Sequence, residues 1–101
     1  MNLTANGVWQ RNPALAWREI DDETVIISPG ESVMHELNDT GSLVWRSIDG
    51  HRNAEELAAL LVARYDVTRE TALADTLSLL EELTSRKLLL PADAPSGGAV
   101  R

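Results

Sequence analysis

The side chains that could catalyse a reaction or hold a metal ion are few in this chain, and they do not cluster. No cysteine is present, which excludes thiolate ligands and a cysteine nucleophile. The two histidines, His35 and His51, stand on different predicted elements and lack the spacing of a metal site. We therefore expect no metal site and interpret both histidines as surface or partly buried side chains.

The acids and serines also lack a catalytic setting. Carboxylate pairs such as Asp21-Asp22 and Glu81-Glu82 fall in a predicted turn or on a predicted helix surface, where solvated charge is the ordinary interpretation. The serines lack the Gly-x-Ser-x-Gly turn of a hydrolase nucleophile, and no glycine-rich phosphate loop occurs. The sequence predicts a protein that is not an enzyme by itself, has no catalytic residue and needs no cofactor.

Charge and hydropathy narrow the possible partners. The formal net charge is −7, and phosphate backbones repel such a surface. Residues 1–50 carry three Lys or Arg against eight Asp or Glu, so a partner that is not acidic is favoured. The start of the chain does not look like a signal peptide, and no apolar run approaches the roughly 20 residues of a membrane span. We expect a cytoplasmic protein that binds neither nucleic acid nor membrane.

The elements that would position any binding residues change in kind near the middle of the chain. Residues 14–20, 24–28 and 32–37 read as strands, since apolar and β-branched residues come in short runs between turn signals such as Pro29-Gly30. Their short connections predict an antiparallel meander. After it, apolar residues recur at helical spacing.

Three helices are predicted from caps and apolar stripes. Asn38 caps the first, which buries Val44, Trp45 and Ile48 and stops at Asp49-Gly50. A capping box at residues 53–56 starts the second helix. Thr68 caps the third, whose apolar stripe is predicted to run through Leu73, Leu77, Leu80 and Thr84, with Thr76, Leu80 and Leu83 extending its edge. Residues 88–91 read as a short strand or as an extended cover over the core.

This order predicts an α+β domain: a three-stranded antiparallel sheet followed by three helices, related to winged helix-turn-helix folds. We expect one domain over residues 14–90, a flexible N-terminal arm over 1–13 and a disordered C-terminal tail over 91–101. If the meander keeps chain order, the third strand lies at a sheet edge. Such an edge can capture a peptide by strand addition, or a helix or residues 88–90 can simply cover it.

An ordered set of motifs resembles the PqqD family, also known as RiPP recognition elements. It starts with Glu36-Leu37-Asn38-x-Thr40-Gly41-x-x-Val44-Trp45-x-x-Ile48-Asp49-Gly50. It continues with Asn53-Ala54-Glu55-Glu56-Leu57, Ala63-Arg64-Tyr65-Asp66-Val67, Ala74-Asp75-x-Leu77-x-x-Leu80-x-x-Leu83 and Lys87-Leu88-Leu89. The resemblance covers about residues 14–90. One departure is the Lys87-Leu88 step, where many members have Lys-Gly-Leu, so the turn there is expected to differ.

The resemblance implies a non-catalytic peptide chaperone. Members bind the leader of a ribosomally made precursor peptide by strand addition, in pyrroloquinoline quinone (PQQ) or other peptide pathways. They then present the precursor to a modifying enzyme, often a radical SAM protein. By position, the docking edge would be Ser32, Val33, Met34, His35 and Glu36, and the helical wall would come from Asp75, Leu79 and Glu82.

Two other functions stay open from the residues alone. A winged-helix regulator would read DNA with the third helix, but that helix carries Glu70, Asp75 and Glu81 where a basic face is needed. A structural partner of an enzyme could instead dock through the acidic surface.

Overall fold

The computed structural model describes residues 7–28 and 33–92. The elements within these residues, in chain order, are β1 (Trp9–Arg11), β2 (Ala16–Ile20), β3 (Glu23–Ser28), β4 (Val33–Leu37), α1 (Asp39–Ser47), α2 (Ala54–Arg64), α3 (Arg69–Ser85) and β5 (Leu89–Pro91). Strands β2, β3 and β4 form one antiparallel sheet in that order, and β1 pairs with β5 in a second, two-stranded sheet. The predicted α+β class, a three-stranded antiparallel sheet followed by three helices, is confirmed. The likeness to winged helix-turn-helix folds stays a prediction.

The pairing register gives the three-stranded sheet two different faces. Trp17, Ile26 and His35 stand opposite one another across the three strands, and Ile26 is fully buried. Because side chains alternate along a strand, the next row, Ala16, Ile27 and Met34, lies on the other face. Met34 is 62% exposed there. One face therefore packs on the helices and the other meets solvent.

Each helix begins at the predicted cap. Asn38 Oδ1 accepts from the backbone N–H of Gly41 at 2.9 Å, and Thr68 Oγ1 accepts from that of Thr71 at 3.1 Å. The capping box of α2 is complete, with reciprocal bonds of 2.9 Å between Asn53 and Glu56. These bonds satisfy backbone donors that the first turn of a helix leaves free.

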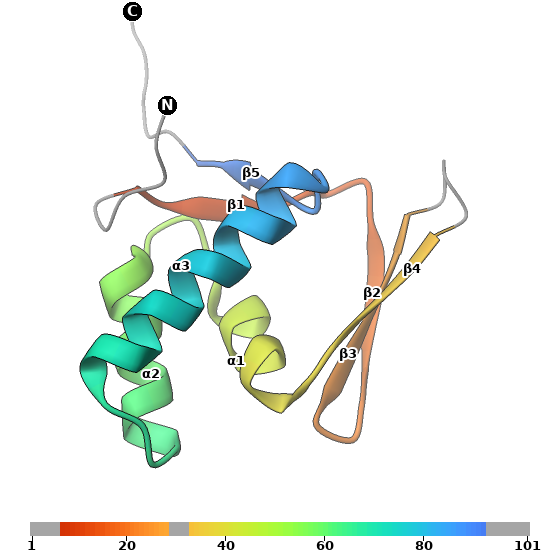
Figure 1. The fold of residues 1–101 in the computed structure, drawn as a ribbon. Helices are drawn as coiled ribbons and strands as arrows, with labels where there is room; N and C mark the ends of the chain where they lie inside the picture. Colours follow the sequence, from red (N-terminus) through yellow and green to blue (C-terminus); the bar gives the residue numbers. More distant parts are fainter. Residues whose placement is uncertain (1–6, 29–32, 93–101) are drawn as a thin grey trace, which may run out of the picture.

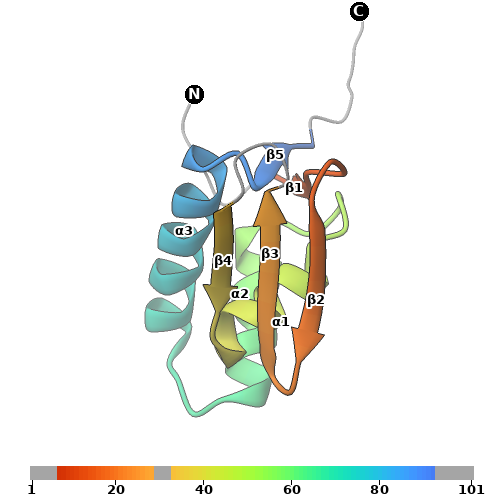
Figure 2. The same ribbon diagram turned by 90° about the vertical axis from the view of Figure 1, so that its right-hand side faces the viewer.

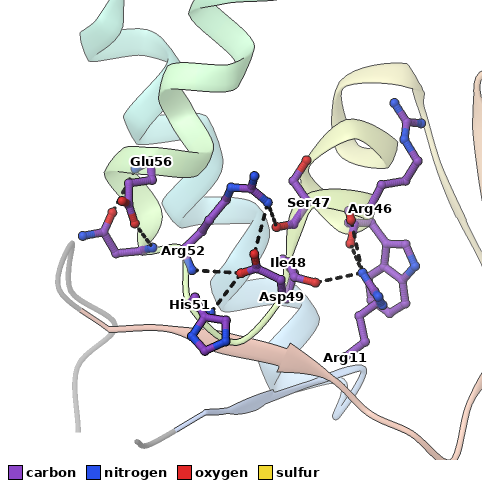
Figure 3. A network of polar contacts seen from close by, with 10 residues as sticks. Arg11, Arg46, Ser47, Ile48, Asp49, His51, Arg52 and Glu56 are labelled. Carbon is purple, nitrogen blue, oxygen red and sulfur yellow. Dashed lines mark hydrogen bonds and ion pairs between the residues drawn. The ribbon is translucent and has the colours of Figure 1, made fainter.

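A polar network fixes the segment between α1 and α2 (Figure 3). Arg11 donates to the carbonyl oxygens of Trp45 at 2.8 Å and Ile48 at 2.9 Å. The Trp45 carbonyl also accepts the backbone N–H of the C-cap residue Ile48 at 3.4 Å. Asp49 Oδ1 accepts from the backbone N–H groups of His51 at 2.9 Å and Arg52 at 3.0 Å. These bonds hold the end of α1 against β1 and set where α2 starts.

The core gathers around α1. Val44, Trp45 and Ile48 are buried as predicted, and α1 contacts both α2 and β3. The buried face of α3 consists of Ala72, Thr76, Leu80 and Leu83. The prediction is therefore confirmed for Leu80 and for the edge residues Thr76 and Leu83, whereas Leu73, Leu77 and Thr84 are only half-buried. Ala72 was missed because its small side chain carries little hydrophobicity.

The N-terminal segment also differs from the prediction. The predicted flexible arm over residues 1–13 is wrong over Trp9–Arg11, which form β1 and pair with β5 through Trp9↔Pro91, Gln10↔Leu90 and Arg11↔Leu89. Trp9 is only 2% exposed and belongs to the core. A three-residue strand is too short to show alternation, and its partner lies at the far end of the chain. Pro91, the predicted start of the tail, ends β5; residues 93–101 lie outside the described part.

The elements form two groups with α1 between them. Figure 1 shows α2 and α3 on one side of α1 and the three-stranded sheet on the other. In the view of Figure 2, β4 is the edge strand of this sheet on the side where α3 lies.

Candidate functional site

Strand β4 has an open edge. Among the described strands it pairs with β3 alone, because β5 pairs with β1 on another part of the molecule. Residues 88–90, one of the predicted covers of this edge, do not pair with it, since Leu89 and Leu90 pair with β1. Half of the N–H and C=O groups of an antiparallel edge strand point away from its neighbour. Those of β4 remain available to another strand.

A groove separates β4 and the start of α1 from α3. It consists of two adjoining hollows that share Asn38, Gly41, Leu79 and Glu82. The first, here the Asp75 hollow, measures about 340 Å³ and is lined by Asn38, Thr40, Gly41, Val44, Leu61, Asp75, Thr76, Ser78, Leu79 and Glu82. The second, here the His35 hollow, measures about 230 Å³ and is lined by His35, Glu36, Leu37, Asn38, Gly41, Leu79, Glu82, Leu83, Arg86 and Leu88. Together they follow α3 for about three turns.

The residues expected on the docking strand divide between the two faces of the sheet. His35 stands on the face toward the helices and lines the His35 hollow together with Glu36. Val33 is 40% exposed, and Met34 points to the outer face. Ser32 lies outside the described residues.

The residues expected on the helical wall all face the groove. Asp75 lines the Asp75 hollow, while Leu79 and Glu82 line both hollows. The structure thus brings His35 and Glu36 of the strand together with Leu79 and Glu82 of the helix around one hollow. These two sets are more than forty positions apart in the chain.

Arg86 joins the two walls and was not expected in the site. Its guanidinium pairs with Glu82 at 2.8 Å and lies 3.4 Å from Nδ1 of His35 across the groove. The sequence places Arg86 at the end of α3, where a cation complements the negative helix pole. Its ion pair with Glu82 could have been predicted from the i,i+4 spacing of the two residues on α3.

Gly41 lets the start of α1 approach the end of β4. A Cβ built on Gly41 would lie 3.2 Å from Asn38 Oδ1 and 3.4 Å from Leu37 Cβ. A larger residue would press on the Asn38 side chain that caps α1. Glycine at position 41 is therefore explained by the close packing at this corner of the groove.

The groove is chemically suited to holding a chain. It offers backbone groups on one wall, leucine side chains on its floor, and carboxylates with one guanidinium on its rim.

Asp49, whose carboxylate accepts backbone hydrogen bonds, lies away from the groove, in the segment between α1 and α2. The bond from the His51 backbone N–H is the main cause that lowers the pKa of Asp49, followed by that from Arg52. No helix among the described residues is long and apolar enough to cross a bilayer.

Solved structures share this fold. TbiB1 in complex with the TbiA(beta) leader peptide is 25% identical, with a TM-score of 0.72 over 86% of this chain and 98% of that one. A lasso peptide synthetase B1 complexed with its leader peptide is 23% identical, with a TM-score of 0.74 over 82% and 98%. The solution structure of the PqqD truncation of Methylobacterium extorquens PqqCD, described as a RiPP recognition element, is 21% identical, with a TM-score of 0.73 over 87% and 94%.

The family assignment comes from the sequence itself. A search of curated proteins finds no match. Residues 23–89 match the family described as coenzyme PQQ synthesis protein D (PqqD). This match runs from the start of β3 to the first residue of β5 and takes in both walls of the groove. It also covers well over half of the chain, so the chain belongs to the PqqD family.

Proposed function

We propose that this domain binds the leader segment of a ribosomally synthesised precursor peptide and presents the rest of the precursor to a modifying enzyme. The leader adds as a strand to the open edge of β4, and α3 forms the opposite wall. The observation that carries the proposal is this unpaired edge, which faces a groove instead of a covering element. The leader complexes of TbiB1 and of a lasso peptide synthetase B1, which share the fold, support it.

The two walls have different tasks in this proposal. Backbone bonds to β4 hold any extended segment, so they supply affinity. Side chains of His35, Glu36, Leu79 and Glu82 distinguish one leader from another, because they surround the positions that alternate residues of the leader would reach. Val33 and Met34 extend the docking edge beyond the groove.

The domain itself acts as a chaperone and leaves the chemistry to its partner enzyme. Among the carboxylates that line the groove, Glu82 is already engaged in an ion pair with Arg86. The pathway is PQQ biosynthesis or another pathway that modifies ribosomal peptides.

Hydrogen exchange followed by NMR tests strand addition directly. A displayed library of random peptides of about 16 residues supplies binders without knowledge of the natural precursor, and an enriched peptide is then added to the labelled domain. We expect every second amide of Val33–Leu37 to gain protection, because those amides point away from β3 in the free domain. Unchanged protection along β4, with shifts elsewhere, would overturn the proposal. Duplex DNA, added in a parallel titration, should produce no change.

A bulky side chain placed in the groove provides a second test. Ser78 is exposed and lines the Asp75 hollow, so Ser78→Phe fills space that the peptide needs. The matched control is Ala63→Phe on the exposed side of α2, which lines neither hollow. We expect about a tenfold or greater loss of peptide affinity for the first variant and none for the second. Equal affinities would contradict the location of the site.

A further inference from the structure

We infer that the Asp75 hollow receives one basic side chain, Lys or Arg, of the bound peptide, with its charged end held by the Asp75 carboxylate and the Thr76 hydroxyl. The inference rests on the proposed function and adds a specificity to it. It follows from three features of the hollow: an unpaired buried hydroxyl, an unpaired carboxylate and an apolar wall.

Thr76 is the first feature. Its side chain is 0% exposed and lines the hollow, and its Oγ1 has no hydrogen-bond partner within the described residues. A helical threonine usually bonds to the carbonyl one turn earlier, and Thr84 on the same helix does so, donating to the Leu80 carbonyl at 2.7 Å. A buried polar group without a partner calls for an explanation. A donor that enters the hollow would supply one, since a hydroxyl oxygen accepts through two lone pairs.

Asp75 is the second feature. Two carboxylates line the hollow, but Glu82 is paired with Arg86 at 2.8 Å, whereas Asp75 takes part in no ion pair among the residues that the structure describes. No Lys or Arg lines this hollow. Its uncompensated charge is therefore negative, which favours a cation and disfavours Asp or Glu in the peptide.

The apolar lining and the small volume of the hollow favour the long side chain of Lys or Arg as the cation that enters it. Val44, Leu61 and Leu79 line it, and the methylene stem of Lys or Arg packs on such a surface while its charged end reaches a polar partner. The volume of about 340 Å³ is at the low end of the range of about 300–1,000 Å³ for small-molecule sites. A single long side chain suits it better than a cofactor.

Charge reversal at Asp75 tests the inference. Peptides of about 16 residues are selected from one random library against the wild-type domain and against Asp75→Lys. We expect wild-type binders to share Lys or Arg at one position of the motif, and the variant's binders to carry Asp or Glu there with the rest unchanged. The same residue at that position in both selections would overturn the inference. Such an outcome leaves strand addition intact as long as β4 amides still gain protection, whereas loss of that protection refutes the proposed function itself.

A threonine pair isolates the hydroxyl. Thr76→Val keeps the shape of the side chain and removes the acceptor. Thr24→Val is the matched control, because Thr24 Oγ1 is equally buried and unpaired but lines neither hollow. With the wild type and the control, replacing the basic residue of a selected peptide by Gln should weaken binding about tenfold. With Thr76→Val the loss should fall below about threefold. An undiminished loss would overturn the role of Thr76, and should Thr76→Val not fold, the selection with Asp75→Lys decides alone.

Discussion

Lys87 holds a backbone conformation that suits glycine. Its φ is 62°, in the left-handed region that L-residues avoid. The residue ends α3: its N–H donates to the Thr84 carbonyl at 2.9 Å, and the N–H of Leu88 donates to the Leu83 carbonyl at 2.9 Å. These two bonds define a Schellman motif, in which glycine is the usual residue at this position. The departure noted in the sequence, Lys87-Leu88 in place of Lys-Gly-Leu, thus falls on the residue with positive φ.

Lys87→Gly should stabilise the domain by about 0.5–1 kcal/mol. Removing the Cβ relieves about 1–2 kcal/mol of left-handed strain, and the greater freedom of glycine in the unfolded chain offsets part of that gain. Urea denaturation measures the change. Lys87→Ala is the control, since alanine keeps the Cβ and should stay within about 0.5 kcal/mol of the wild type. If the glycine and alanine variants have the same stability, the positive φ at position 87 imposes no measurable strain on a residue with a Cβ.

Asp49 should make part of the stability depend on pH. Backbone N–H groups stabilise its carboxylate and lower its pKa in the folded state below the usual 3.8. A lowered folded pKa contributes stability that is present above the unfolded pKa and is lost as pH falls through the folded one. Asp49→Asn removes that contribution. The stability gap between wild type and variant, measured in urea, should therefore shrink from about pH 6 to about pH 3. A gap that stays constant would show that the charge of Asp49 contributes nothing.

At the scale of elements, the sequence predicted the helix starts and the strands of the three-stranded sheet, because these depend on residues close together in the chain. The caps at Asn38, Asn53 and Thr68 were predictable because each bond closes within a few residues. The strands of the three-stranded sheet were predictable because β-branched residues fall between turns. Strand β1 was missed because its partner, β5, is about eighty positions away and neither strand exceeds three residues.

Strand β1 contributes to the core far more than its length indicates. Trp9 is buried with the helices, so Trp9→Ala should destabilise the domain by about 3–5 kcal/mol through lost burial and a cavity. Trp17, which is 37% exposed beside Trp45, is the matched control, and its replacement by Ala should cost clearly less. Chemical denaturation of both variants checks this. Equal losses would mean that the pairing of β1 with β5 leaves the core unaffected.

At the scale of the whole molecule, the groove depends on contacts that no local pattern encodes. Neither the hydrophobic period of α3 nor the alternation of β4 says that Glu82 lies near His35, and Arg86 was assigned only to its own helix. The resemblance to the family predicted residues of both walls, because positions were transferred from relatives in which strand and helix already lie on either side of the bound peptide. It did not include the Arg86–His35 contact or the unpaired Thr76 hydroxyl, because both follow from how side chains of distant segments pack in the assembled structure.

The net charge of −7 should steer a basic leader toward the domain. Summed acidic charge accelerates the approach of a cationic ligand, and added salt screens this attraction. The ion pair that we propose for the Asp75 hollow would form only after docking, so salt should affect it less. We therefore expect the association rate of a selected peptide to fall about tenfold between about 20 and 300 mM NaCl, with a smaller change in dissociation rate. Stopped-flow anisotropy with a labelled peptide measures both rates.

The same peptide with Gln in place of its basic residues is the control, and its association should respond little to salt. If the basic peptide is equally insensitive, the acidic surface serves only solubility, and the recognition of basic residues must be confined to the groove.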